Sequence, residues 1–369
     1  MPRLPKSRLA FYFLCFLCAS TNPSCAQHKV DVVVYPGSEL LSTVHLLSDS
    51  APIERSTYRM EVLKYFAPYK NDPAVQKARR LPYINCDFPV RLSWAFYDYP
   101  NLKLSQPETL VGYENFRQNK AQIQDYFAAC LGFYQRSHFQ EFYEAHRQEY
   151  QEWIASFNRN LNESGLLKDL DDFYGFVPSK KIIITLGAMN CGTYAVPDMS
   201  VINPYFKNTM VLMIAYSSII REKESDTLEP SFFSPIWASQ LLWHEMGHAY
   251  LNDLFAEYKD AIDSLGPIAA RDTAGGQDTV VRQYSAGMGW LAWFNENVTQ
   301  AITSYLRIKT GKMDRDAELK RLTVNTFSIH VPELIDIIEK NYPDRFRYRD
   351  FRDFFPILLR EFRLRCEKK

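Results

Sequence analysis

Residues 234–258 read SPIWASQLLWHEMGHAYLNDLFAEY, and one uninterrupted helix accounts for the whole stretch. Ser234 followed by Pro235 is typical of a helix start, because serine suits the N-cap and proline costs nothing at the first helical position. After Pro235 the stretch contains no proline and a single glycine, Gly247. Apolar residues lie nearly all round the predicted helix, so we expect it to be buried.

Two histidines lie four residues apart in this helix. His244 and His248 therefore project from one face, where both imidazoles can reach the same metal ion. Glu245 is rotated by roughly 100° from His244, so it suits a base for a coordinated water rather than a ligand. The five residues match HExxH, the motif of zinc metallopeptidases. The alternative is a pair of core histidines bonded to carbonyl groups, but the spacing and the intervening glutamate favour a metal.

A catalytic zinc needs a third protein ligand and one open position. No histidine occurs among the six residues after His248. A second predicted helix, from Trp290 to about Ile308 and ended by Gly311, carries Glu296. Glu296 lies opposite the apolar stripe of that helix, on a face that suits either a polar cleft or plain solvent exposure. With HExxH upstream, we predict Glu296 as the third ligand and Zn2+ as the cofactor.

A HExxH helix followed by an Asn-Glu pair on a later helix resembles the gluzincin clan of zinc peptidases. There the downstream glutamate is the third ligand, a role that maps onto Glu296. The resemblance implies an α+β, predominantly helical chain with a zincin-like core and a small mixed sheet before the HExxH helix. Two features depart from thermolysin-like members. Gln300 stands where they carry an aspartate that orients a ligand histidine, and the 47 residues between His248 and Glu296 form a longer gap.

Other segments of the chain carry a second resemblance. The segments are Glu39–Val44, Tyr58–Phe66 and Tyr69–Val75, together with the HExxH helix and its Asn-Glu partner. In these the chain is similar to a family of secreted bacterial proteins described as a domain of unknown function (number 4932), with a predicted peptidase-like site. This resemblance implies architecture and export rather than a particular substrate.

The N-terminus predicts export. Three basic residues precede the apolar stretch Leu9–Ala19, whose eleven residues are too few to span a bilayer. Small residues predict cleavage after residue 26, so that 1–26 is a signal peptide, and the alternative is lipidation at Cys18 or Cys25. No later segment is long and apolar enough for a membrane span. We therefore expect a periplasmic or secreted protein, with a lipoprotein as the alternative.

The net charge indicates which classes of partner to expect, and the cysteines indicate which disulfides are possible. Losing the signal peptide removes three basic and no acidic residues, so the formal charge changes from 0 to −3. This balance does not indicate binding to nucleic acid or to an anionic membrane; the expected partner is a peptide or protein substrate. The four remaining cysteines show no CxxC spacing, and three disulfide connectivities are open to them. They are Cys86, Cys130, Cys191 and Cys366.

The mature chain divides into three predicted parts. Residues 27–175 are mainly helical, with a short strand at Asp31–Val34. Residues 176–312 form the catalytic core, in which strands at Lys181–Leu186 and Thr209–Ile214 precede the HExxH helix and the Glu296 helix. Residues 313–369 are helical again. The helices expected in the first part, from apolar residues at helical intervals, are Leu40–Leu47, Thr57–Phe66, Tyr113–Phe133 and His138–Leu161.

Candidates for lining the cleft are less sharply defined. The glycine-rich segment Leu265–Gly289 is predicted to be irregular and suits a cleft wall; it holds Tyr284, a candidate oxyanion donor. His330 is a second candidate donor, although a lone downstream histidine is more often a surface or capped residue. The segment Gly187–Ala195 either lies near the substrate cleft or is a plain connecting loop.

These residues favour an exported zinc-dependent hydrolase, specifically a metallopeptidase. Glu245 would accept a proton from zinc-bound water and pass it to the leaving amine. The first alternative is a non-catalytic binding or scaffold protein that retains a zincin fold with a bound zinc. The second is a surface protein with structural zinc, which requires a fourth protein ligand. Cleavage preference, endopeptidase or exopeptidase action and oligomeric state are not predicted.

Overall fold

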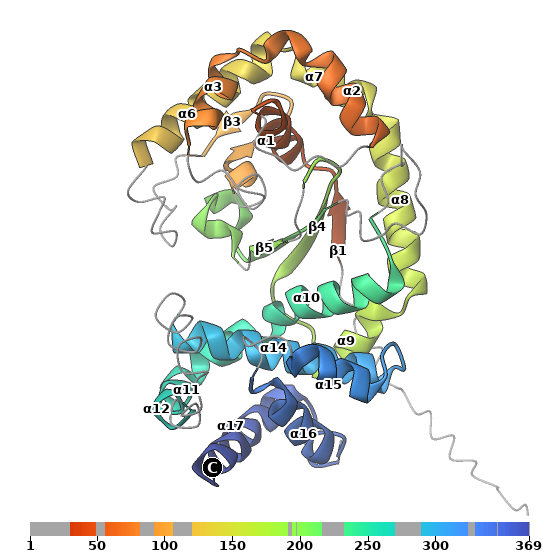
Figure 1. Ribbon diagram of the computed structural model, residues 1–369, viewed down its shortest axis with the longest axis vertical. Coiled ribbons are helices and arrows are strands. Elements are labelled where there is room, and N and C mark those ends of the chain that lie inside the picture. Colours follow the sequence, from red (N-terminus) through yellow and green to blue (C-terminus); the bar gives the residue numbers. More distant parts are fainter. Residues whose placement is uncertain are drawn as a thin grey trace, which may run out of the picture.

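The computed structural model describes residues 30–48, 56–81, 92–105, 120–190, 194–196, 198–215, 232–269, 289–323, 329–344 and 346–368. These residues are predominantly helical and include a small mixed sheet (Figure 1), as predicted at that level. The predicted signal peptide, residues 1–26, lies outside the described residues.

Four strands form the sheet, in the order β1-β4-β6-β5. Their bounds are β1 Val30–Val33, β4 Lys181–Gly187, β5 Tyr194–Val196 and β6 Thr209–Ala215. The strands β1, β4 and β6 run parallel, with Val30 opposite Ile182 and Lys181 opposite Thr209, and β5 runs antiparallel along the outer side of β6. Strands β4 and β6 are apolar almost throughout, as expected of parallel strands buried on both faces.

Three of these strands lie where the sequence predicted them, since their apolar runs are long enough to be recognised. The edge strand β5 was not predicted, because three residues are too few to show an alternating pattern. A separate hairpin pairs β2 (Phe96–Tyr97) with β3 (Lys103–Leu104). The edge position of β5 places part of the predicted Gly187–Ala195 segment at the border of the sheet.

The helices before β4 are α1 Pro36–Leu47, α2 Thr57–Tyr65, α3 Pro73–Arg80, α6 Lys120–Arg136, α7 Phe139–Ala145, α8 Arg147–Glu163 and α9 Leu166–Tyr174. All except α9 form the upper part and one side of the molecule, and α9 lies low, beside α10 (Pro235–Glu257) and α14 (Trp290–Lys309). Figure 1 shows α2, α3, α6 and α7 arching over the sheet, with α8 running down one side. Helix α1, which follows β1 directly, is buried from Gly37 to Leu47.

One segment that was predicted as a single helix forms two helices in the structure. The expected helix over His138–Leu161 breaks at His146, which separates α7 from α8. The His146 ring bonds the Phe142 carbonyl through Nδ1 at 2.8 Å and the Glu61 carboxylate through Nε2 at 2.9 Å. The hydrogen bond to Glu61 of α2 thus stabilises the turn at His146. The break was missed because this contact is between residues far apart in sequence, which the local helical pattern does not reveal.

The helices after β6 form the lower part. They are α10 Pro235–Glu257, α11 Lys259–Asp263, α12 Gly266–Ala269, α14 Trp290–Lys309, α15 Arg315–Thr323, α16 Val331–Asn341 and α17 Phe351–Lys368. In Figure 1, α10 lies across the lower end of the sheet, α14 lies beneath it, and α16 and α17 are farthest from the sheet. Helix α10 packs against β6, α9 and α14, while α14 also packs against α15 and α16.

The rotation of α10 about its axis is fixed from its α9 side. Trp243 donates its indole N–H to the Leu166 carbonyl at 2.8 Å. Tyr250 donates its hydroxyl to Asp171, and its ring stacks on Tyr174 with centroids 4.2 Å apart. The helix begins at Pro235 as predicted, although the Ser234 side chain makes no capping hydrogen bond. These contacts leave the histidine face of α10 turned toward α14.

Two further predictions concern cysteines and membranes. Cys130 and Cys366 are buried thiols, so neither takes part in one of the pairings that the sequence left open; Cys86 and Cys191 lie outside the described residues. Burial raises the pKa of Cys130, which makes this thiol unreactive. Within the described ranges, no helix has the length and apolar character that crossing a bilayer would require.

Candidate metal centre

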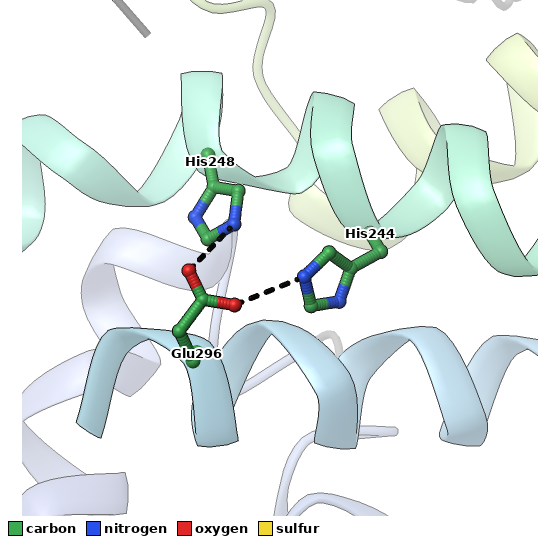
Figure 2. Close-up of side chains that lie close together, drawn as sticks. All are labelled: His244, His248 and Glu296. Carbon is green, nitrogen blue, oxygen red and sulfur yellow. Dashed lines mark hydrogen bonds and ion pairs between the residues drawn. The ribbon is translucent and has the colours of Figure 1, made fainter. Parts of the chain in front are cut away.

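His244, His248 and Glu296 converge between α10 and α14 (Figure 2). Nε2 of His244 lies 3.1 Å from one Glu296 carboxylate oxygen, and Nε2 of His248 lies 3.4 Å from the other. The potential ligand atoms of the three residues all lie within 4.8 Å of one another, and in the described part of the chain no other group of three or more His, Cys, Asp or Glu residues meets this condition. The two imidazoles and the carboxylate that the sequence paired are thus neighbours in space.

The spacing of these atoms can be compared with what zinc requires. Donors at roughly 2.0–2.1 Å from a tetrahedral ion are about 3.4 Å apart. The two nitrogen–oxygen separations, 3.1 and 3.4 Å, are close to that value. Two imidazole nitrogens and a carboxylate also form a donor set that zinc accepts in catalytic sites. The residue types therefore suit a zinc ion, and the two separations run to different oxygens of Glu296.

The face of α14 that carries Glu296 is buried against α10. Thr299 and Thr303 share this face, and both are fully buried. The Glu296 side chain retains 28% exposure. Of the two alternatives for this face, the described residues thus give a partly enclosed polar site rather than plain solvent exposure. The helix ends with Gly311 at φ +69°, a left-handed conformation that glycine adopts without strain.

Gly247, inside the HExxH motif, permits the close approach of the two helices. A Cβ atom at this position would lie 3.1 Å from Cγ2 of Thr299 and 3.3 Å from the Tyr174 hydroxyl. Both separations are shorter than ordinary van der Waals contact. Glycine is therefore the residue that lets α14 come near enough to bring Glu296 to the histidines.

The orientation of His248 is set by side chains beyond the three converging groups. Its Nδ1 lies 3.2 Å from Oδ1 of Asn295 and 3.4 Å from the Thr299 hydroxyl. Asn295 in turn donates its amide to Oδ1 of Asn252 at 2.9 Å. This donation directs the Asn295 carbonyl oxygen at His248, so we assign the proton to Nδ1. Nε2 of His248 is then left with a lone pair, as a metal ligand requires.

His244 differs from His248 in its outer contacts. Its Nδ1 is buried and has no hydrogen-bond partner among the described residues. Burial tends to lower the pKa of His244, but the hydrogen bond to Glu296 and the neighbouring carboxylates outweigh it and raise the pKa above the usual value. In His248 burial dominates and lowers the pKa to about 4. His248 is thus neutral at pH 7, the form that binds metals.

The Glu296 carboxylate is held in its charged form. Burial raises its pKa, but the hydrogen bond from His244 and the charges of both histidines lower it further, so the net pKa falls below the ordinary value. Glu245 lies next to His244 in sequence, is half-buried, and its charge helps to raise the pKa of His244. Glu245 is not part of the converging group.

The remaining candidate residues are scattered or not described. Tyr284 lies outside the described residues. His330 is buried at the N-terminal end of α16, where its ring packs edge-on against Trp293 and Phe362 and its Nδ1 lies 3.5 Å from Glu333. These contacts belong to a packed core residue, and the role of His330 as an oxyanion donor stays a prediction. In the Gly187–Ala195 segment, residues 191–193 lie outside the described residues.

Comparison with known proteins gives a family but no function. The family model for a domain of unknown function (DUF4932) matches residues 97–360, well over half of the 369-residue chain. The chain belongs to this family. The predicted membership of this family is confirmed over residues 97–360, whereas the segments Glu39–Val44, Tyr58–Phe66 and Tyr69–Val75 precede the matched range. No curated protein and no solved structure matches the chain, so the family assignment leaves the activity to be argued from the site.

Sequence reasoning missed the residues that support the converging groups. Gln300, which occupies the position of the orienting aspartate in thermolysin-like enzymes, donates instead to Ser304 at 3.1 Å. Asn295 and Thr299 contact His248 in its place. Asn295 was detectable, because it directly precedes the predicted ligand and a polar residue at that point of a packed helix calls for a partner. Asn252 was harder to find, since it is identified only once α10 and α14 are aligned.

Proposed function

We propose that this protein is an exported zinc-dependent hydrolase of the metallopeptidase type. His244, His248 and Glu296 would hold the ion, and Glu245 would act as the general base. The proposal includes the gluzincin-like arrangement of HExxH helix and downstream glutamate. The observation that carries it is the convergence of these three side chains, whose potential ligand atoms lie within 4.8 Å of one another.

The donor set favours a catalytic over a structural ion. Structural zinc sites are closed by four protein ligands, whereas catalytic sites use three and keep one position for water. Three side chains of the described residues meet here. Glu296 remains partly exposed, so solvent or substrate has access to the site. The hydrogen bond from His248 to Asn295 supports the same interpretation, because ligand histidines are normally oriented in this way.

The chemistry follows from the neighbouring groups. Held by His244, His248 and Glu296, a zinc ion would supply Lewis acidity, which would lower the pKa of water to about 7 and polarise a carbonyl. Glu245 takes a proton from the attacking water as the water oxygen bonds to the scissile carbonyl carbon. The carbon–nitrogen bond then breaks, and Glu245 delivers the proton to the departing amine nitrogen. One water is consumed, and a carboxylic acid and an amine are released.

Metal content and cleavage together test the proposal. The chain lacking residues 1–26 is purified without added metal, its zinc is quantified, and its cleavage of unfolded proteins is followed with and without chelator. We expect about one zinc per chain and chelator-sensitive cleavage. Glu245→Gln should retain zinc and lose activity by about 10²-fold or more, the usual contribution of a general base.

The matched control is Glu257→Gln, the same substitution at the exposed end of the same helix, which should leave both zinc and activity intact. Full activity of Glu245→Gln, or zinc-free protein that cleaves, would reject the mechanism. A wild-type protein that binds zinc without cleaving any substrate would instead favour the non-catalytic binding protein.

The exported location is part of the proposal. It rests on the basic and apolar composition of residues 1–26, which suits a signal peptide. Expression of the full chain in a bacterium, followed by fractionation and mass determination of the mature N-terminus, tests it. A mature chain beginning at Gln27 is expected; a lipid-modified Cys18 or Cys25 would indicate an anchored protein, and an intact N-terminus in the cytoplasm would refute export.

A further inference from the structure

A line of polar side chains, half-buried at Gln300 and buried from Ser304 on, continues along α14 beyond Glu296. Gln300, one helical turn farther on, donates to the Ser304 hydroxyl at 3.1 Å. Ser304 donates in turn to Oε1 of Glu318, on α15, at 2.7 Å. Side chains from α14 and α15 are thereby linked into one hydrogen-bond network that begins one turn from the proposed metal ligand.

Glu318 is the centre of this network. Its side chain is fully buried, and two arginines contact it. Arg307 reaches both carboxylate oxygens through Nη1, at 3.1 and 2.9 Å. Arg321 reaches them through Nε at 3.0 Å and Nη2 at 2.7 Å. Because one carboxylate neutralises only one guanidinium, the three side chains together carry a net charge of +1.

The excess positive charge is presented by Arg321. Arg307 is 2% exposed, whereas Arg321 is 36% exposed. The Nε/Nη2 edge of Arg321 is occupied by Glu318, and its Nη1 makes no hydrogen bond to any other residue in the described ranges. The second edge of the guanidinium, Nη1 with the remaining Nη2 hydrogen, is thus available to an acceptor. Such an edge suits a carboxylate, which can accept two parallel N–H bonds.

Arg321 lies on the helix that packs against the Glu296-bearing helix. Helix α15 contacts α14, and the hydrogen-bond network that ends at Arg321 begins at Gln300, one turn from Glu296. Since Glu318 fixes the orientation of the guanidinium, Arg321 loses little conformational entropy on binding a ligand. A fixed, partly exposed cation beside a hydrolytic site is well suited to recognise part of the substrate.

We propose that Arg321, held in place by Glu318, binds a carboxylate of the substrate, so that the site prefers peptides with an acidic group near the bond to be cleaved. This inference rests on the proposed peptidase function for its substrate class. The carboxylate has two sources, an Asp or Glu side chain or the free C-terminus of a peptide. Both present the same planar pair of oxygens to the guanidinium edge.

Binding without turnover tests the inference. The Glu245→Gln protein, as purified, is titrated with two pairs of hexapeptide pools by calorimetry. One pair differs by Glu or Gln at fixed positions, and the other by a free or an amidated C-terminus. We expect the acidic member of at least one pair to bind about tenfold to a hundredfold tighter, the range of a hydrogen-bonded charge pair. The pair that discriminates identifies the source of the carboxylate.

Substitutions assign the preference to Arg321. Arg321→Gln, added to the same background, should abolish it, and Arg321→Lys should retain only part of it because a lysine lacks the guanidinium edge. Glu318 keeps Arg307 as a partner in both variants, so the fold is expected to persist. The matched control is Arg315→Gln on the same helix, whose partners are Asp336 and Glu339; it should keep the full preference.

The outcomes separate this inference from the proposed function. Equal affinities within both pairs of pools, or a preference that survives Arg321→Gln, overturn the inference even if the wild-type protein cleaves peptides. A preference that Arg321→Gln removes sustains it. If the purified wild-type protein contains no zinc and cleaves nothing, the hydrolytic function fails, yet the titration still decides whether Arg321 binds carboxylates.

Discussion

Nδ1 of His248 lies 3.2 Å from Oδ1 of Asn295, the residue directly before the glutamate whose carboxylate faces both imidazoles. One turn of α14 therefore supplies a predicted ligand and also the group that orients another. Asn295 is itself held by Asn252 from α10. The two helices are thus joined by a polar chain that begins on one, crosses to the other and returns.

Asn295→Ala should weaken zinc binding about tenfold to a hundredfold, the usual effect of removing a group that orients a ligand histidine. Competition with a chromophoric chelator measures the affinity. The matched control is Gln300→Ala, because Gln300 holds the position that thermolysin-like enzymes use for this purpose, yet bonds Ser304 here. Zinc affinity should change by less than about threefold in this control. An equal loss in both variants would show that Asn295 has no special part.

Gly247→Ala should weaken zinc binding although alanine is the better helix former. Alanine gains about 1 kcal/mol of helix propensity, but its Cβ would lie 3.1 Å from Cγ2 of Thr299, whose hydroxyl contacts His248. We expect the crowding to move Thr299 and to lower zinc affinity about tenfold, with a small change in melting temperature.

A double variant isolates the crowding at Gly247. Thr299→Ser removes Cγ2 and keeps the hydroxyl, so adding it to Gly247→Ala should restore most of the zinc affinity. If the double variant binds zinc no better than Gly247→Ala alone, contact with Thr299 is not the cause.

Much of the site could be predicted from sequence because its information is local. The His244–His248 spacing requires only a helix, and Glu296 is visible on the polar face of a second predicted helix, opposite its apolar stripe. The pairing of strands that are far apart in sequence could not be predicted in this way. The alignment of Val30 with Ile182 joins strands about 150 residues apart, and neither segment indicates the other as its partner.

The sequence also did not predict that charged residues of α15 are buried. A charged helix such as α15, with Glu318 among basic residues, is ordinarily taken as a solvated face. Here Glu318 is fully buried because Arg307 and Arg321 neutralise it from two helices. Arg307 lies near the end of α14, where cations are common, so nothing local distinguished it. Burial of this pair depends on how α14 and α15 pack, which only the tertiary structure reveals.

Zinc should raise the stability of the wild-type protein and leave Glu296→Gln unchanged. A ligand that binds only the folded state stabilises it by about 2.7 kcal/mol at a free concentration of 100 Kd. Thermal melts with buffered zinc, before and after chelator, measure the shift. Replacing one carboxylate oxygen with an amide removes a charged ligand, so the shift should largely vanish. Glu257→Gln should respond as wild type does; a full zinc response in Glu296→Gln would exclude Glu296 as a ligand.

Glu39 should give the protein a pH-dependent stability that is independent of the metal centre. Its carboxyl is buried and accepts a hydrogen bond from Tyr58 at 2.6 Å. The pKa of Glu39 is raised from 4.5 to about 7, and burial is the largest cause. The hydrogen bond from Tyr58 and the charge of His146 lower the pKa, and the charge of Glu149 raises it, but these effects are smaller. A raised pKa in the folded state means that the stability from protonated Glu39 is complete below pH 4.5 and is lost as pH rises through 7.

The size of this loss follows from the shift, at about 1.4 kcal/mol per pH unit between the two pKa values, or on the order of 3 kcal/mol in total. Glu39→Gln cannot ionise and retains an acceptor for Tyr58, so its stability should lack this decline. Urea unfolding of both proteins at pH 5 and pH 8 gives the comparison. His45, whose pKa is lowered to about 4 mainly by burial, acts in the opposite sense: its contribution is present above pH 6.5 and is lost as pH falls through 4. That contribution is common to both proteins and cancels in their difference. The prediction is wrong if the difference in unfolding free energy between the wild type and Glu39→Gln is the same at pH 5 and pH 8. Such a result would show that folding does not raise the pKa of Glu39.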